Sequence, residues 1–321
     1  MTEYRIEHDT MGEVKVPADA LWRAQTQRAV DNFPISDRPL ESAQIRAMGL
    51  LKAACAQVNL DRGLLPADRA EAIISAAKEI ADGKHDAEFP IDVFQTGSGT
   101  SSNMNTNEVI ASIAKANGVE VHPNDDVNMS QSTNDAYPTG FRLGLHAAVD
   151  HLIERMDGLR AAFQDKGNEF QDILKMGRTQ LQDAVPMTLG DEFKGFANNL
   201  NEEQALLRDA QRRLLEINLG ATAIGTGVNT PAGYRHQVTA ALSEVTGLEM
   251  KTARDLIEAT SDCGAYVLLH ATIKRAAMKL AKICNDLRLL SSGPRAGLAE
   301  INLPARQAGS SIMPGKVNPV I

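Results

Sequence analysis

Four short segments rich in glycine, hydroxyl and amide side chains interrupt an otherwise helical pattern, and these are the places where chemistry could occur. They cover residues 95–103, 130–135, 177–183 and 309–318. The first three precede or interrupt a predicted helix, where free backbone N–H groups, hydroxyls and amides can bind an anion such as a carboxylate. One such cluster alone is most often a cap or a loop, but four in one chain favour a binding site.

Segment 309–318 carries the residue types needed to remove a proton next to a carboxylate. Gly309 and Gly315 permit a tight loop that places serines beside a lysine and an asparagine. The reaction requires a base and a site for the double negative charge that builds on the carboxylate. Ser310 is the candidate base, and Lys316 and Asn318 are candidates to hold the charge. A serine becomes a base only where N–H donors and positive charge stabilise its alkoxide; a lysine-bearing surface turn is the alternative interpretation.

Composition narrows the kind of protein that carries these segments. With 321 residues, 43% hydrophobic and 23% charged, the chain can form a sizeable core and is unlike disordered proteins. The net charge of −8 argues against a nucleic-acid partner. No apolar run is long enough for a membrane span, and the first residues lack the basic-then-apolar order of a secretory signal. We therefore expect a cytoplasmic protein. Three widely spaced cysteines predict neither disulfides nor a zinc site.

Helices must position these segments. The strict alternation of apolar and polar residues that is typical of strands is rare, and long stretches rich in alanine and leucine lack proline. We therefore predict a mainly α fold. The longest predicted helices cover 139–176, 186–216 with Pro186 in the first turn, and 253–290. Helices of this length must pack against one another.

The first part of the chain has a different pattern, which predicts shorter helices separated by turns. These are predicted at 41–60, 66–82 and 107–117, after a short β-hairpin within 4–16 that turns at 11–13. We predict a mostly helical N-terminal domain over 1–138 and a central long-helix bundle domain over 139–321, which carries the loop 309–318.

Segment Gly309–Asn318 matches the signature loop of the fumarase/aspartase superfamily, and the other three segments follow that family's order and spacing. The resemblance covers Tyr4 to Ile321. It implies three mainly helical domains, long central helices that associate in the core of a homotetramer, and active sites built from three different chains. It implies a small dicarboxylate substrate and no metal or organic cofactor.

Within this family the sequence is mixed. Residues 1 to about 130, and segment 96–103 above all, resemble class II fumarases, whereas 132–140, 175–183 and 255–266 resemble aspartate ammonia-lyases. Fumarases resemble one another in a Gly-Arg-Thr-His motif whose histidine is associated with handling water; this chain has Gln180 there, and Thr133 where fumarases usually have serine. The resemblance therefore implies the elimination of ammonia from L-aspartate, giving fumarate through an aci-carboxylate intermediate.

The resemblance also implies a role for each motif residue. Ser310 would take the C3 proton, and Lys316 and Asn318 would hold the carboxylate that becomes the aci-carboxylate. The remaining residues would bind the substrate carboxylates and the leaving amine and complete the pocket: Ser98, Thr100, Ser132, Thr133, Asn134, Thr179 and Gln180.

Two alternatives remain open. One is fumarate hydratase on the same scaffold, supported by the first 130 residues or so and opposed by Gln180 and Thr133. The other is an inactive fragment or a non-catalytic structural protein, for which lens crystallins recruited from a related lyase are the precedent. Family members continue past the signature loop with further bundle helices and a small C-terminal domain, so the resemblance implies a C-terminally truncated chain.

Overall fold

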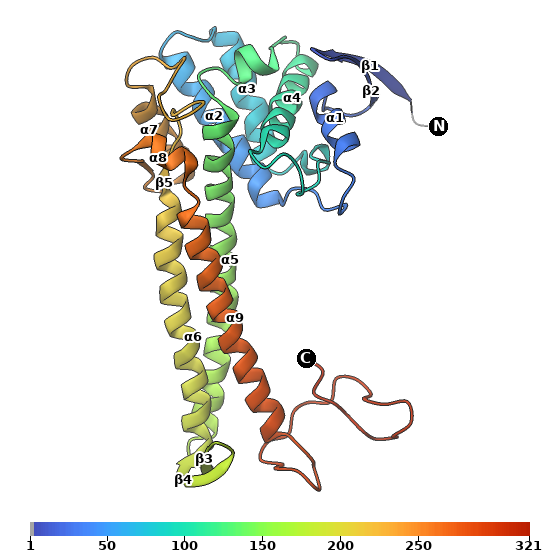
Figure 1. Ribbon diagram of the computed structural model, residues 1–321, viewed down its shortest axis with the longest axis vertical. Coiled ribbons are helices and arrows are strands. Elements are labelled where there is room, and N and C mark those ends of the chain that lie inside the picture. The colour runs from blue at the N-terminus through green and yellow to red at the C-terminus, as the bar shows by residue number, and fades with distance from the viewer. Residues whose placement is uncertain (1–2) are drawn as a thin grey trace. The chain divides into compact units, whose positions relative to one another are not determined.

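The computed structural model describes residues 3–321, and helices form most of it (Figure 1). This confirms the predicted mainly α fold. Contacts divide the chain into two units. Unit 1 contains the chain up to His151 together with Ala210–Tyr266, and unit 2 contains Leu152–Asp209 and Val267–Ile321. The predicted division at residue 138 falls inside a helix, at a proline that does not end it.

Unit 1 is built around one buried helix. Its elements are β1 (Tyr4–Asp9), β2 (Gly12–Pro17), α1 (Ala24–Asn32), α2 (Ser42–Asp61), α3 (Ala67–Ala81), η1 (Asp86–Glu88), α4 (Thr100–Ala116), the π-helix η2 (Pro123–Val127), the first part of α5 (Thr133–Glu169), η3 (Arg213–Leu215), β5 (Glu216–Ile217), α7 (Tyr234–Thr246), β6 (Lys251–Thr252) and α8 (Leu256–Ser261). Helix α2 packs against both α3 and α7, which is why apolar residues occur all around it. In α3, by contrast, Ile73, Ala77 and Ile80 form a single buried stripe.

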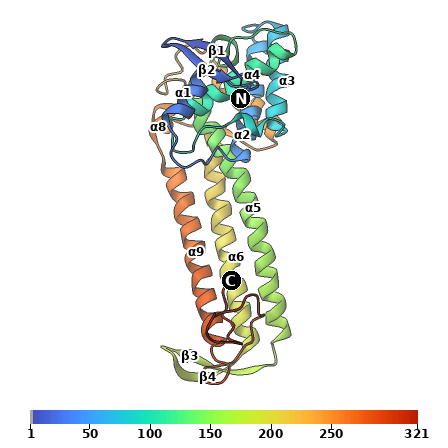
Figure 2. The ribbon, with the colours of Figure 1, turned by 90° about the vertical axis from the view of Figure 1, so that its right-hand side faces the viewer.

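Unit 2 contains most of three long helices and one hairpin. Strands β3 (Leu174–Thr179) and β4 (Gln182–Thr188) pair antiparallel and connect α5 to α6 (Leu189–Arg212), and α9 (Gly264–Leu290) lies beside both helices in two views (Figure 2). Phe193 and Phe196 of α6 pack with Phe163 of α5 and Ile283 of α9. Residues 291–321 form no helix or strand and contain one isolated bridge, between Ala308 and Val317.

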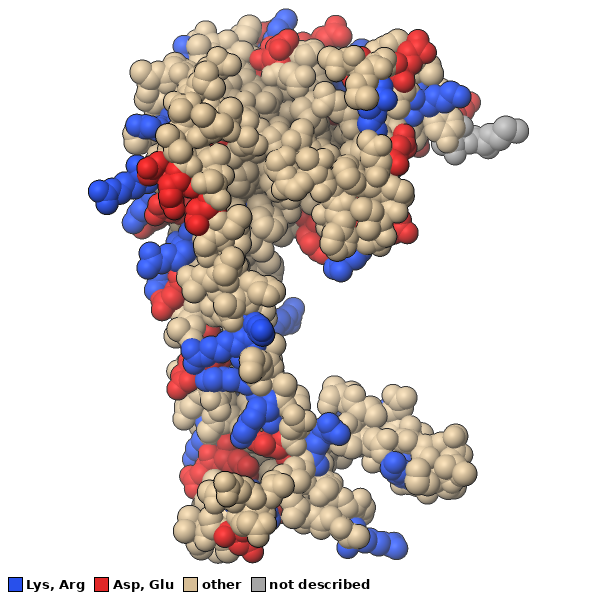
Figure 3. All heavy atoms as spheres, in the orientation of Figure 1, with Lys and Arg blue, Asp and Glu red and all other residues tan. Residues whose placement is uncertain are grey.

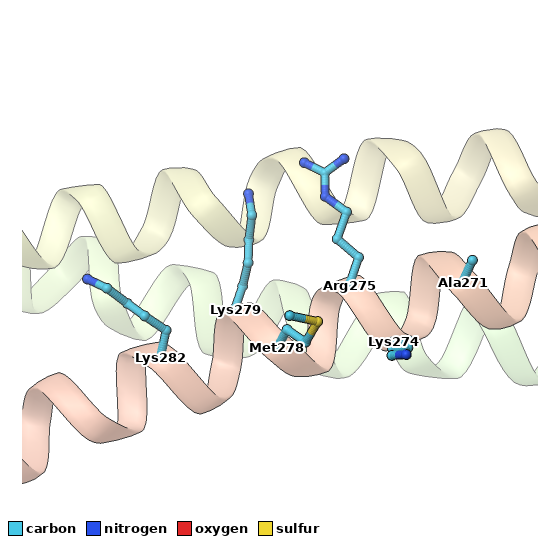
Figure 4. Close-up of a pocket in the computed structure, with 6 residues that line it drawn as sticks. All are labelled: Ala271, Lys274, Arg275, Met278, Lys279 and Lys282. Atoms are coloured by element: carbon cyan, nitrogen blue, oxygen red, sulfur yellow. The ribbon is translucent and has the colours of Figure 1, made fainter.

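Ion pairs add to this packing of α6 against α9. The buried Glu203 carboxylate forms ion pairs with Arg275 at 3.1 Å and with Lys279 at 2.9 Å. Both cations point from α9 toward the neighbouring long helix, and they line a cavity of about 430 Å³ together with Ala271, Lys274, Met278 and Lys282 (Figure 4). None of the sequence-predicted site residues lies in this cavity.

Charge on the face of unit 2 shown in Figure 3 is mixed, since Lys and Arg alternate there with Asp and Glu. None of the helices within residues 3–321 is both long and apolar enough to cross a membrane.

The structure confirms several predicted elements and corrects others. The helices α2 and α3 and the strands of the N-terminal hairpin lie where the sequence predicts them, but the hairpin turns at 10–11 rather than at 11–13. The predicted helix 107–117 begins earlier, at Thr100, and the predicted helix 253–290 is two helices, α8 and α9.

Of the two other long helices, α5 begins six residues before the predicted start and ends seven residues before the predicted end, and α6 is shorter than predicted at both ends. Helix α5 ends at Glu169, and Pro186 belongs to β4 rather than to the first turn of α6. A two-stranded hairpin tolerates this proline because a strand with a free edge does not need every N–H for pairing.

Candidate active site

The first site segment is shaped by a glycine at the start of α4. Gly99 has a φ of 80°, in the left-handed region, and is the residue from which the helix begins. On either side of it, the hydroxyls of Ser98 and Thr100 lie 3.1 Å apart in a hydrogen bond, and both side chains are exposed. Two hydroxyls at a helix N-terminus form a site suited to a carboxylate only when other groups complete it.

A buried carboxylate organises the second segment. Asp135, which is fully buried, accepts the N–H of Ser132 at 2.9 Å, and the Ser132 hydroxyl accepts the N–H of Asn134 at 3.3 Å. The other Asp135 oxygen accepts the N–H groups of Gly220 at 3.0 Å and Thr222 at 2.9 Å. Burial raises the pKa of Asp135 to about 6, although these N–H donors favour its charged form. Asp135 therefore fixes the backbone that presents Ser132, Thr133 and Asn134.

Residues 218–223 form a wall of this site that the sequence analysis missed. The side-chain amide of Asn134 donates to the carbonyl of Ala223 at 2.7 Å. The side-chain amide of Asn218 donates to the carbonyl of Asn134 at 3.0 Å and to the Thr260 hydroxyl at 3.1 Å. Because the amide N–H2 of Asn134 is used in this way, its oxygen is left as an acceptor. The available signal was segment 218–230, where three glycines, three threonines and two asparagines interrupt the helical pattern.

The structure brings the first and second segments together within unit 1. The side-chain amide of Asn103, in the first turn of α4, donates to the Thr133 hydroxyl at 3.3 Å. Ser98, Thr100, Ser132, Thr133 and Asn134 therefore belong to one region where α4 and α5 begin.

The third segment forms the tip of the β3–β4 hairpin in unit 2. Thr179 pairs with Gln182, so Gln180 and Leu181 make a two-residue turn, with φ values of 52° and 63°. Such turns favour Asn-Gly because both residues adopt positive φ, and here two bulky residues carry that strain. Thr179 and Gln180 are exposed, and Gln180 also lines a cavity of about 310 Å³ beside α9.

Four charged side chains hold this hairpin to its surroundings. Glu300 pairs with Arg178 of β3 and, at 3.1 Å, with Lys175 of the same strand. Lys175 also pairs with Glu192 in the first turn of α6. The hydrogen bond from Arg178 is the main reason that the pKa of Glu300 lies below its ordinary value. Sequence reasoning did not identify Glu300 as a residue that positions the hairpin.

The signature loop closes on itself. The N–H of Gly309 donates to the Lys316 carbonyl at 2.9 Å, and the Asn318 side-chain amide donates to the Gly309 carbonyl at 3.1 Å. Inside the loop, Oγ of Ser310 accepts the N–H groups of Ile312 at 3.3 Å and Met313 at 3.1 Å. Two N–H donors on a serine oxygen stabilise negative charge there, which is what a serine base requires.

A cavity of about 430 Å³ adjoins this loop. Lys316 and Asn318 line it together with Arg288, Ser291, Ser292 and Asn302 among others. Thus Ser310, Lys316 and Asn318 are brought together on one loop in unit 2. Within residues 3–321, no group of three or more His, Cys, Asp or Glu side chains could hold a metal ion.

Comparisons with known proteins identify the family. A family model described as lyase matches residues 12–321. The chain is 64% identical to an aspartate ammonia-lyase of Corynebacterium glutamicum over 99% of its length and 62% of the relative's. It is 61% identical to a class II fumarate hydratase of Corynebacterium efficiens, over 99% of this chain and 68% of that protein.

A solved structure shows the same fold. The crystal structure described as fumarate lyase:delta crystallin from Brucella melitensis bound to cobalt superposes with a TM-score of 0.96 at 50% identity, covering 99% of this chain and 71% of that one. The chain thus spans between 62% and 68% of the length of the two curated relatives. With the signature loop, the helical fold and these likenesses in agreement, the chain belongs to the fumarase/aspartase superfamily of lyases.

Proposed function

We propose that this chain carries residues of an aspartate ammonia-lyase, which eliminates ammonia from L-aspartate to give fumarate. The observation that supports the elimination chemistry, which both activities of this family share, is the environment of Ser310. Its oxygen accepts two backbone N–H groups in a loop that also bears Lys316 and Asn318. The proposed base and the two groups proposed to bind a carboxylate therefore belong to one short segment.

The reaction uses these groups in sequence. Ser310, as the alkoxide, takes a proton from C3, and the electron pair moves onto the adjacent carboxylate to form the aci-carboxylate. The Lys316 ammonium and the Asn318 amide stabilise the added negative charge. The electrons then return to form the C2–C3 double bond as the C–N bond breaks, and ammonia leaves. Ser98, Thr100, Ser132, Thr133 and Asn134 are proposed to hold the second carboxylate and the amine.

Position 180 favours ammonia over water as the leaving group. Gln180 has no group that titrates near neutral pH, whereas the histidine of the fumarase motif can hold and release a proton. The amide oxygen of Asn134 is an acceptor, which suits an ammonium group. Fumarate hydratase is the second candidate, and segment 96–103 together with the 61% identity to a class II fumarate hydratase favours it.

We also propose that the site is completed by other copies of the chain in a homotetramer, with Thr179 and Gln180 completing the pocket. Apolar side chains exposed on α9 support this, since Val267 and Met278 are each 65% exposed. Light scattering of the purified chain tests it, because a stable monomer would contradict the proposal.

The activity is tested by incubating the purified chain separately with L-aspartate and L-malate and following fumarate by its ultraviolet absorbance. We expect fumarate from aspartate at the higher rate, and Ser310→Ala is the matched blank. A higher rate from malate would favour the hydratase. Fumarate from neither substrate would show that the chain is not a catalyst by itself.

A further inference from the structure

A lysine amine lies in the interior of unit 1, where charged groups are rare. Lys52 of α2 has no exposed surface. Its Nζ donates to three side-chain oxygens: Asn103 at 2.8 Å, Asn128 at 3.0 Å and Gln131 at 2.8 Å. The acceptors come from two stretches of chain: Asn103 lies in the first turn of α4, whereas Asn128 and Gln131 lie in the loop between η2 and α5.

The three acceptors match the three N–H donors of a protonated amine, so the charged form of Lys52 satisfies this cage completely. All three acceptors are neutral amides, so a buried positive charge is solvated here without a direct carboxylate partner. Burying a charge is costly, and an apolar residue would fill this core position without that cost. The free-energy cost of burying this charge therefore indicates that Lys52 has a role other than packing.

The cage connects directly to the proposed site. Asn103 uses its oxygen for Lys52 and its N–H2 for the Thr133 hydroxyl at 3.3 Å and the Asn128 oxygen at 3.1 Å. Gln131 immediately precedes Ser132, and its amide also donates to the carbonyl of Val127. Lys52 therefore links the start of α4, which presents Ser98 and Thr100, to the turn that presents Ser132 and Thr133.

We propose that Lys52 is a positioning residue. Through Asn103, Asn128 and Gln131, its protonated amine fixes the positions of the two proposed substrate-binding segments of unit 1 relative to each other. The inference rests on the proposed function only for the identity of the substrate. Lys52 itself touches no substrate.

The surroundings of Lys52 make the relative position of these two segments sensitive to pH. The titratable groups that face it are Cys55 of α2 and Asp135 of α5, and Tyr234 of α7 lies against both of these. Burial lowers the pKa of Lys52 to about 8. Once the proton is lost, the amine has two donors for three acceptors, so one acceptor is left without its hydrogen bond.

The first experiment needs no catalysis. Amide hydrogen exchange is compared in the whole chain and in Lys52→Met, with Lys78→Met, an exposed lysine of α3, as the control. We expect exchange in Lys52→Met to rise about tenfold or more in 96–103 and 128–135 while α3 keeps its protection. Unchanged exchange in those two segments would overturn the proposal, whether or not the chain makes fumarate.

The second experiment distinguishes a positioning role from a general effect on stability. It uses a different variant, so it remains informative if Lys52→Met does not fold. In Gln131→Ala only two acceptors remain, and the neutral amine can satisfy both. Compared with the unaltered chain on the same substrate, the alkaline decline of kcat/KM in Gln131→Ala should move to higher pH, and KM should rise more than kcat falls. If the alkaline decline of kcat/KM in Gln131→Ala occurred at the same pH as in the unaltered chain, the proposal would be overturned. If the unaltered chain makes no fumarate, the proposed function fails, and the exchange experiment still decides the role of Lys52.

Discussion

Gly99 and Tyr137 are packed so closely that a β-carbon on Gly99 would lie 2.2 Å from the tyrosine ring. This contact sets the start of α4 against the first turns of α5. It explains why a glycine stands between Ser98 and Thr100, since the position requires both a left-handed φ and the absence of a side chain.

Gly99→Ala is therefore expected to destabilise unit 1. The left-handed conformation alone costs an alanine about 1–2 kcal/mol, and displacing the ring adds to that. Gly97→Ala is the matched control, because a β-carbon there meets no atom within 4 Å. Urea unfolding monitored by circular dichroism measures both variants. Equal midpoints for the two would contradict the packing described.

Asp135→Asn tests the buried carboxylate. An asparagine presents N–H2 where one carboxylate oxygen accepts the N–H groups of Gly220 and Thr222, and each buried group left unpaired costs about 1–3 kcal/mol. Asp255→Asn is the control, because Asp255 is an exposed cap at the start of α8 and asparagine caps equally well. A loss of stability no larger than that of the control would refute this role.

The pH dependence of the same group has a defined sign. The pKa of Asp135 is raised from 3.8 to about 6, so between these values the folded state binds more protons than the unfolded chain. Its contribution to stability is therefore full below about pH 4 and falls by about 3 kcal/mol as the pH rises to about 6. Carboxylates with lowered pKa, Glu300 among them, gain stability over the same range, so unfolding midpoints are compared as a difference between two chains. The unaltered chain should lose stability relative to Asp135→Asn as the pH rises from about 4 to about 6.

Glu300→Gln is expected to loosen the β3–β4 hairpin. It removes the carboxylate from Arg178 and from Lys175, whose side chain is only 8% exposed, at a cost of about 1–3 kcal/mol. Because the pKa of Glu300 lies below 4.5, its contribution is present above that pH and is lost as the pH falls through the folded pKa. Glu202→Gln, which breaks an exposed pair with Lys279, should have a much smaller effect. Thermal unfolding at pH 7 compares the two, and similar losses would argue against the hairpin's dependence on Glu300.

Ser310→Ala should lower fumarate formation by on the order of 10²–10⁴, because removing a general base typically has this effect. Binding of aspartate should persist, since the proposed carboxylate contacts of Thr100, Thr133, Asn134 and Asn318 remain. Ser311→Ala is the neighbouring control and should have less effect. If Ser310→Ala still exchanged the C3 proton of aspartate with solvent at the normal rate, another residue would be the base.

Gln180→His should shift the preference toward malate. Histidine tolerates a φ near 52° and adds a group that titrates near neutral pH, so the ratio of malate to aspartate kcat/KM should rise by roughly 10²-fold. Leu181→His, which places the same ring one residue further along the turn, is the control. An unchanged ratio in Gln180→His would remove position 180 as the determinant of the leaving group.

The mainly α fold, the N-terminal hairpin and the helices α2 and α3 follow from local sequence alone, because periodicity, caps and turns act over a few residues. The motif Gly309–Asn318 likewise indicated the family, since its residue types are specific in themselves. The roles of the ten predicted site residues stay predictions.

Tertiary structure decided what local patterns do not encode. The hairpin at 174–188 took the place of parts of two predicted helices. Its Lys175 and Arg178 both pair with Glu300, which is distant in sequence, and Lys175 also pairs with Glu192 of the following helix. Asp135 and Lys52 look in sequence like ordinary charged residues of helices, which are usually exposed. Only folding shows that they are buried, because the partners that make their burial tolerable, such as Gly220 for Asp135 and Gln131 for Lys52, come from distant segments of the chain.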